Sequence, residues 1–262
     1  MKRIAIEAAM QAGKILIDHI GNLKKGQISS KNRFDFVTHV DKLSEAKIIE
    51  VISGRYPEHR FYAEEGIKQD AGGHRWIIDP LDGTTNYIHT YPCYAISIAL
   101  EIDGRIELGV IYDPGRDELF VAEKGGGATL NGSRIHVSGQ RDPALSLLCT
   151  GFPFRCKENI DLYLDSFKQL FLVTSGIRRT GSVALDFCSI ASGRSEGFWE
   201  IGLSPWDVAA GYLMILEAGG KMTDFAGGDD PIWTGNVVAS NGYLHEHILN
   251  TVRAVFAGYI ER

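Results

Sequence analysis

The sequence lacks several features that would each define a class of protein. Its 262 residues include four cysteines that form no C-x-x-C pair, so neither a zinc knuckle nor a disulfide framework is indicated. No stretch reaches the ~20 uninterrupted apolar residues of a membrane span. There is no G-x-G-x-x-G and no Walker A sequence, so dinucleotide and nucleoside-triphosphate binding have no motif support.

Positive charge is also in short supply. Lys and Arg number 27 against 33 Asp and Glu, and this net charge of −6 argues against a surface built to bind nucleic-acid phosphates. The N-terminal apolar segment is interrupted by charged residues such as Glu7 and Lys14, which is typical of an amphipathic helix rather than a signal peptide. We therefore predict a cytoplasmic protein that binds neither nucleic acid nor membrane.

What is present is the composition of a globular protein, with 44% hydrophobic and 23% charged residues. Apolar residues recur at helical spacing over 4–20 and 41–52, which predicts two helices in the first third of the chain. Short β-rich runs separated by turn sequences such as Asn131-Gly132 then predict an antiparallel meander. These runs cover 76–78, 94–102, 105–112, 118–122 and 128–137.

Strand and helix patterns alternate after about residue 143, which predicts an α/β layer. The expected strands cover 145–150, 176–179, 197–200, 221–224 and 237–240, and the expected helices cover 159–171, 182–191, 205–218 and 244–256. No flexible linker separates the two parts. We therefore expect an N-terminal α+β half (1–143) and a C-terminal α/β half (144–262), packed as one unit with a cleft between them.

Two acids mark the first candidate site. The apolar run 76–78 predicts a buried strand ending in Asp79, because Pro80 lacks an N–H and should turn the chain out of the sheet. Asp82 follows three residues later. Two carboxylates held this close repel each other unless a cation lies between them. An ordinary Asp-Gly turn with an incidental second acid is the alternative.

The residues that follow add a site of the opposite kind. Gly83 permits close approach of the backbone, and the segment 84–86 can open a helical turn whose N–H groups attract an anion such as phosphate. A metal ion together with a phosphate satisfies both the acids and the N–H groups. Mg²⁺ is the leading candidate because it prefers hard oxygen ligands.

Three further acids have ordinary structural roles available. Asp41 heads a predicted helix and can be its N-cap. Glu64 follows the apolar run 61–63 and can be part of a solvated acidic turn. Asp207 follows Ser204-Pro205, so it can complete a capping arrangement, although an acid in the first turn of a helix can also point into a cleft.

Taken together, four segments in order resemble the motifs of the inositol monophosphatase family, within the lithium-sensitive, Mg²⁺-dependent sugar phosphatases, and in particular a bacterial-type inositol-1-monophosphatase. They are DFVTHVD (35–41), AEEG (63–66), WIIDPLDGTTNYIH (76–89), and WDVAAG with EAGG (206–211 and 217–220). The resemblance covers nearly the whole chain. It implies a layered αβαβα sandwich of two sheets flanked by helices, and a homodimer.

The resemblance also implies a set of metal ligands. Glu64, Asp79 and the carbonyl of Leu81 hold one Mg²⁺, while Asp79, Asp82 and Asp207 hold a second, so that Asp79 bridges the two ions. A third, more weakly held ion is associated with Glu64.

Catalytic and phosphate-binding roles follow from the same resemblance. Thr84 and Asp41 orient the attacking water, with Glu64 assisting through the third ion. Gly83, Thr84 and Thr85 form the cradle for the phosphate.

The alcohol half of the substrate is assigned in the same way. Glu200 accepts hydrogen bonds from ring hydroxyls, and Gly181, Ser182 and Val183 line the pocket together with Arg178. Without the resemblance, an exposed acid at a strand end is the simpler interpretation of Glu200.

The predicted activity is the hydrolysis of a small phosphorylated polyol, myo-inositol monophosphate first, by two-metal activation of water. Fructose 1,6-bisphosphate, histidinol phosphate and adenosine bisphosphates stay open, because related enzymes hydrolyse them with the same metal core. An interaction or regulatory protein with incidental phosphatase activity is an alternative of another class. The segment 193–197 matches a G-x-S-x-G nucleophile elbow only formally, because a helix pattern precedes it and a strand pattern follows.

Overall fold

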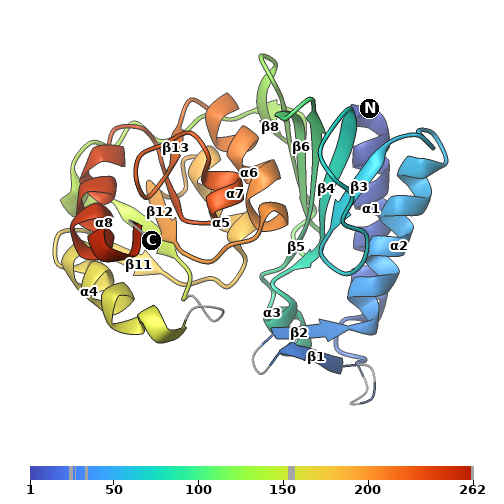
Figure 1. Cartoon of the computed structure of the whole chain (residues 1–262), viewed down its shortest axis with the longest axis horizontal. Coiled ribbons are helices and arrows are strands. Elements are labelled where there is room, and N and C mark those ends of the chain that lie inside the picture. Colours follow the sequence, from blue (N-terminus) through green and yellow to red (C-terminus); the bar gives the residue numbers. More distant parts are fainter. Residues whose placement is uncertain (24–25, 27, 33–34, 153–156, 261–262) are drawn as a thin grey trace.

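Helices and sheets alternate in five layers across the molecule, as Figure 1 shows. The computed structural model describes residues 1–23, 26, 28–32, 35–152 and 157–260. The helical layers are, in order, α1 (Lys2–His19) with α2 (His39–Ser53), α5 (Val183–Ala191) with α6 (Pro205–Glu217), and α4 (Ile160–Phe171) with α8 (His245–Ile260). This order confirms the predicted layered sandwich.

The first sheet has seven strands and lies between the first two helical layers. Its strands are, in spatial order, β3 (Arg60–Ala63), β4 (His74–Asp82), β5 (Ala95–Ile102), β6 (Arg105–Asp113), β7 (Glu118–Glu123), β8 (Gly127–Leu130) and β9 (Ser133–Arg134). From β4 onward each strand pairs antiparallel with the next, which confirms the predicted meander. Asn131 and Gly132 both have positive φ in the last turn, as the hairpin interpretation requires.

The second sheet has five strands in the order β11-β10-β12-β14-β13. They are β10 (Leu147–Thr150), β11 (Gly176–Arg178), β12 (Gly197–Glu200), β13 (Lys221–Asp224) and β14 (Val237–Ser240), and the short helix α7 (Pro231–Thr234) precedes β14. β10 is parallel to both of its neighbours, whereas β14 is antiparallel to both of its own. The division of the chain at 143/144 stays a prediction.

Successive side chains on the central strands pack alternately into two different hydrophobic cores, one on each face of the sheet. In β4, Ile77 faces the middle helices while Trp76 and Ile78 face α1 and α2. Both faces of the sheet are covered, so the sequences of its strands are continuously apolar instead of alternating between apolar and polar residues. At one point the middle layer comes especially close, because a Cβ on Gly109 of β6 would lie 2.7 Å from the carbonyl oxygen of Ala210 in α6.

The expectation that the chain leaves the sheet at Pro80 is wrong. β4 continues through Pro80 to Asp82, and the pairing shifts from Asp79↔Ser97 to Asp82↔Ala95. Three steps along β4 thus match two steps along its neighbour, which is a β-bulge, one of the few places in a sheet that accept proline. The hydroxyl of Ser44 donates to the Pro80 carbonyl oxygen at 2.7 Å and so satisfies a group that the bulge leaves out of the ladder.

A small hairpin was not predicted. The strands β1 (Ile28–Asn32) and β2 (Asp35–Thr38) form a separate antiparallel hairpin just before α2. Its residues are largely polar, so no alternating apolar pattern announced it. Over the described parts of the chain, none of the helices combines the length and the apolar character needed to cross a membrane.

Candidate active site

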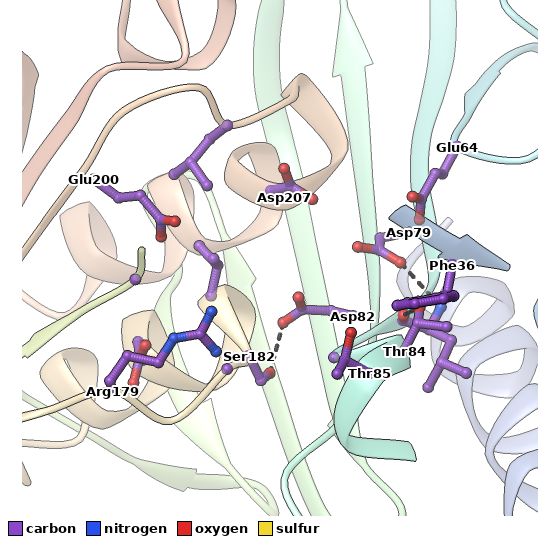
Figure 2. A pocket seen from close by; sticks show the side chains of 17 residues that line it. Phe36, Glu64, Asp79, Asp82, Thr84, Thr85, Arg179, Ser182, Glu200 and Asp207 are labelled. Carbon is purple, nitrogen blue, oxygen red and sulfur yellow. Dashed lines mark hydrogen bonds between the residues drawn. The ribbon is translucent and has the colours of Figure 1, made fainter. Parts of the chain in front are cut away.

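A cavity of about 340 Å³ opens between the first sheet and the helices of the middle layer. Three helices begin at its wall: Gly83 is the N-cap of α3 (Thr84–Ile88), Ser182 is the N-cap of α5, and Asp207 lies in the first turn of α6. Because helix N-termini carry partial positive charge, this arrangement favours acidic side chains and anionic ligands at the cavity. Figure 2 shows the acids of the two halves facing one another across it.

The lining brings together most of the residues that the sequence singled out. They are Glu64, Asp79, Leu81, Asp82, Gly83, Thr84, Thr85, Gly181, Ser182, Val183, Glu200 and Asp207. Asp41 lies behind Thr84 and is reached through a hydrogen bond, as described below.

The β-bulge of β4 positions the first two acids. Oδ1 of Asp79 accepts a hydrogen bond from the backbone N–H of Leu81 at 3.0 Å, inside the bulge itself. Oδ2 of Asp82 accepts from the Ser182 hydroxyl at 2.6 Å and from the Ala184 N–H at 2.8 Å, so the start of α5 grips this carboxylate from the other half of the chain. Both acids are thereby fixed through one oxygen.

The pKa values of these two acids show that the cavity disfavours their negative charges unless a positive charge is added. Burial, followed by repulsion from Glu64, Asp82 and Asp207, raises the pKa of Asp79 well above its usual value. Burial also raises the pKa of Asp82 to about 7, although the hydrogen bond from Ser182 opposes the rise. A cation between the carboxylates would offset both the burial and the repulsion.

Asp207 is both a helix cap and a cavity residue. Its Oδ2 accepts from the Ser204 N–H at 2.7 Å, and a reciprocal bond completes a capping box at the start of α6. The same carboxylate lines the cavity opposite Asp79. The two interpretations of this acid in the sequence are therefore compatible.

Asp41 has a similar double position. Its Oδ2 accepts from the N–H and the hydroxyl of Thr38, at 2.8 and 2.6 Å, in the capping box of α2. Its Oδ1 accepts from the Thr84 hydroxyl at 3.0 Å, and that hydroxyl also lies 3.0 Å from the carbonyl oxygen of Leu81. Burial raises the pKa of Asp41 to about 6 against the bonds from Thr38.

The donor set fits a hard divalent cation held partly by water and phosphate. Four carboxylates, Glu64, Asp79, Asp82 and Asp207, line one cavity, and no cationic side chain among the described lining residues lies between them. Within the described residues, no three His, Cys, Asp or Glu side chains are close enough to enclose a metal by themselves. Mg²⁺ rarely uses such a cage, because it keeps waters and binds through a few carboxylates plus phosphate oxygens.

At the other end of the cavity the lining contains a different arginine from the predicted Arg178, whose role in binding substrate stays a prediction. Arg179 lines the cavity, whereas Arg178 is exposed on the edge strand β11 and lies outside the lining. Successive residues of an extended chain point to opposite sides, so only one of two adjacent arginines can face the cavity. The predicted strand 176–179 did not indicate which one.

Other lining residues were missed altogether. Asp186, in the first turn of α5, lines the cavity, and burial raises its pKa to about 8. Its position four residues after Ser182 on a predicted helix was the available signal, since the two share one face. Phe36 of β2 also lines the cavity, but the unpredicted hairpin hid it.

Comparison with known proteins agrees with this geometry. The sequence profile of the inositol monophosphatase family matches residues 1–256. Nus factor SuhB of Escherichia coli K12 is 45% identical over 267 aligned residues, covering 100% of this chain and 99% of that protein. The extragenic suppressor protein SuhB of Bartonella henselae superposes with a TM-score of 0.92 at 40% identity, covering 96% of this chain and 98% of that one.

A second solved structure carries an enzyme name. The inositol monophosphatase of Anabaena sp. PCC 7120 superposes with a TM-score of 0.86 at 41% identity, covering 96% of this chain and 94% of that one. The family match, together with the five-layered fold and the carboxylate-lined cavity, supports a phosphatase of a superfamily that is generally metal-dependent. The chain belongs to the inositol monophosphatase family.

Proposed function

We propose that this protein hydrolyses the phosphomonoester of a small polyol in a Mg²⁺-dependent reaction, with myo-inositol monophosphate as the first candidate substrate. The observation that carries the proposal is the convergence of Glu64, Asp79, Asp82 and Asp207, from both halves of the chain, on one cavity beside the backbone turn at Gly83.

The proposed ligands are those that the family resemblance implies. Glu64, Asp79 and the Leu81 carbonyl would hold one Mg²⁺, and Asp79, Asp82 and Asp207 a second. Bound metal would lower the pKa of a water molecule and stabilise the negative charge on the leaving oxygen. The protein holds Asp79 and Asp82 ready for this through the N–H and hydroxyl donors already described.

Thr84 and Asp41 would position the attacking water. The Thr84 hydroxyl has a single proton, which it donates to Asp41 or to the Leu81 carbonyl, so its lone pairs face the cavity as acceptors. A water that donates a hydrogen bond to the Thr84 hydroxyl keeps the lone pairs of its own oxygen free to attack the phosphorus. The carboxylate of Asp41, fixed by Thr38, keeps the hydroxyl in that orientation.

The phosphate would lie against the start of α3. Gly83 has φ +88°, and a Cβ there would lie 2.9 Å from the Cys93 carbonyl oxygen, so only glycine lets the chain turn this tightly. Thr84 and Thr85 line the cavity in the first turn of α3, where helical N–H groups lack intrahelical partners and can donate to phosphoryl oxygens.

The alcohol would extend toward Glu200, with Gly181, Ser182 and Val183 beside it. Glu200 is 4% exposed, and its Oε2 has no hydrogen-bond partner among the described residues. A buried carboxyl oxygen without a donor is costly, so a substrate hydroxyl that donates to it gains affinity.

Phosphate release from a substrate panel tests this function. The panel comprises inositol 1-phosphate, fructose 1,6-bisphosphate, histidinol phosphate and adenosine 3′,5′-bisphosphate, each with Mg²⁺ and with a chelator. We expect Mg²⁺-dependent release, with the highest kcat/KM for inositol 1-phosphate. Absence of metal-dependent release from every ester would overturn the assignment, and a higher kcat/KM for another ester would replace the substrate alone.

A second role is favoured by one of the comparisons. The Escherichia coli relative at 45% identity bears the name of a factor rather than of an enzyme. We propose that this chain also acts by docking on other macromolecules. Asp82→Asn, introduced in the cell, separates the two roles. Docking predicts that the variant loses phosphatase activity but keeps the cellular role of the protein. If the cellular role is lost together with the activity, docking is contradicted.

A further inference from the structure

The two ends of the cavity differ in charge. Glu64 and Asp79 lie at one end, while Glu200 and Arg179 lie at the opposite end, as Figure 2 shows. Arg179 is the only basic side chain among the described residues of the lining. The far end therefore presents a donor of five N–H groups next to a carboxyl acceptor.

Glu200 is held in place without being satisfied. Its side chain is buried, its Oε2 lacks a hydrogen-bond partner among the described residues, and burial raises its pKa to about 8 while the charge of Arg179 opposes the rise. Gly151 leaves the space that the carboxyl group occupies, because any Cβ there would overlap it. The oxygen is thus poised to accept from a ligand.

Arg179 acts on Glu200 and Asp186 through its charge, which opposes the rise in their pKa values, but it has no hydrogen-bond acceptor of its own among the described residues. It is exposed, and its guanidinium forms no hydrogen bond or ion pair with the residues that the structure describes. It passes over Gly181, where a Cβ would lie 2.7 Å from Nη1 and where φ is +89°, so a glycine makes room for the arginine at the cavity. Its neighbour Arg178 is exposed as well but lies outside the lining.

We propose that Arg179 determines the substrate specificity of the proposed phosphatase, by donating hydrogen bonds to the alcohol part of the substrate while Glu200 accepts one from it. This inference rests on the proposed function. A hydroxyl group both donates and accepts, so two vicinal hydroxyls match an arginine and a carboxyl group side by side. An ammonium group offers only donors and is repelled by the positive charge of Arg179, so an alcohol that carries one in place of a hydroxyl is disfavoured.

The substrate class that this end selects is therefore a neutral or anionic polyol phosphate. Cationic alcohols such as histidinol phosphate are selected against, although the phosphate end would bind them equally well. The discrimination is a difference in kcat/KM between two substrates that share the same reacting group.

The test compares kcat/KM for inositol 1-phosphate and histidinol phosphate in four proteins. Wild type should prefer inositol 1-phosphate. Arg179→Gln should lose about tenfold to a hundredfold in kcat/KM for it, the range for one charge-assisted hydrogen bond, and Arg179→Glu should shift the ratio further toward histidinol phosphate. Arg141→Gln, which removes the same charge from an exposed arginine outside the lining, should keep the wild-type ratio.

The outcomes separate this inference from the function on which it rests. If wild type releases no phosphate from any ester, the proposed function fails. If wild type is active but both Arg179 variants keep its ratio within about twofold, or if Arg141→Gln shifts the ratio as much as Arg179→Gln does, Arg179 does not determine specificity. A loss of kcat/KM that is equal for both substrates would likewise contradict a role in selecting the alcohol.

Discussion

Single acidic residues in this protein combine structural and site positions. Asp41 caps α2 through one oxygen and holds Thr84 through the other, and Asp207 caps α6 while it lines the cavity. A cap fixes the carboxylate relative to the helix, so the remaining groups of the site are placed with little side-chain freedom. The helix caps are thus part of how the site is built.

The raised pKa values of the cavity acids give the chelator-treated protein an unusual pH dependence. Free aspartate has a pKa of 3.8, whereas burial raises the pKa of Asp82 to about 7 and that of Asp186 to about 8. Between these values the folded state binds more protons than the unfolded state, so its stability falls as the pH rises. We expect the melting temperature without metal to decrease from pH 5 to pH 8.

Added Mg²⁺ should reverse this trend, because the metal replaces the protons that the acids lose. The gain in melting temperature on adding Mg²⁺ should therefore grow with pH. Thermal unfolding followed by circular dichroism at pH 5, 6, 7 and 8, with a chelator and with Mg²⁺, checks both trends. A melting temperature without metal that rises over this range would contradict the electrostatic account.

At the residue scale, the sequence predicted the acids better than the basic residue. Asp79, Asp82 and Asp207 stand in motifs with strong local signals, such as proline, glycine and a helix start. Arg179 has no such signal, because its place in the cavity depends on which way an edge strand turns. That choice is made by packing rather than by local sequence.

At the scale of elements, a buried cation links the two halves near the site. Arg75 of β4 forms an ion pair with Glu101 of β5, at 2.7 Å with both side chains 4% exposed. Its guanidinium lies 5.4 Å from the ring centre of Tyr62 and 4.9 Å from that of Trp233. Tyr62 in turn packs on Trp206, the residue before Asp207.

Removing one partner of this pair should be costly. Arg75→Met leaves the carboxylate of Glu101 buried without its counter-charge, so we expect the free energy of unfolding to fall by about 3–5 kcal/mol. The double variant Arg75→Met with Glu101→Leu should recover most of this loss. Urea denaturation measures both.

An exposed pair provides the matched control. Lys124 and Glu107 are 2.7 Å apart, but their side chains are 44% and 33% exposed, so Lys124→Met should cost less than about 1 kcal/mol. If Arg75→Met costs no more than Lys124→Met, the buried pair does not hold these elements together.

Elements with a clear apolar period were predicted from the sequence, and those set by tertiary contacts were not. The meander and the long helices follow the expected runs closely. The passage of β4 through Pro80 depends on a bulge that the neighbouring strand β5 and Ser44 stabilise. The hairpin of β1 and β2 is polar, so its sequence differs little from that of a loop.

At the scale of the whole molecule, the site exists only because the two halves meet. Asp82 from the first sheet is held by Ser182 and Ala184 of the second half, and Asn86 donates to the Thr180 carbonyl oxygen at 2.9 Å. These bonds span about a hundred residues of sequence, so no local pattern predicts them. Only the resemblance to a family placed Asp207 with Asp79 in advance.

The central claim is that the carboxylates of this cavity bind the metal that hydrolysis needs, and Asp79→Asn tests it most directly. The variant removes the acid proposed to bridge two ions, while it also removes buried repulsion and so should fold normally. The measurement is phosphate release from inositol 1-phosphate as Mg²⁺ is titrated into chelator-treated protein, with unfolding curves of both proteins beside it. We expect the folded variant to be slower by at least about 1,000-fold at every Mg²⁺ concentration; near-normal activity would contradict the metal site.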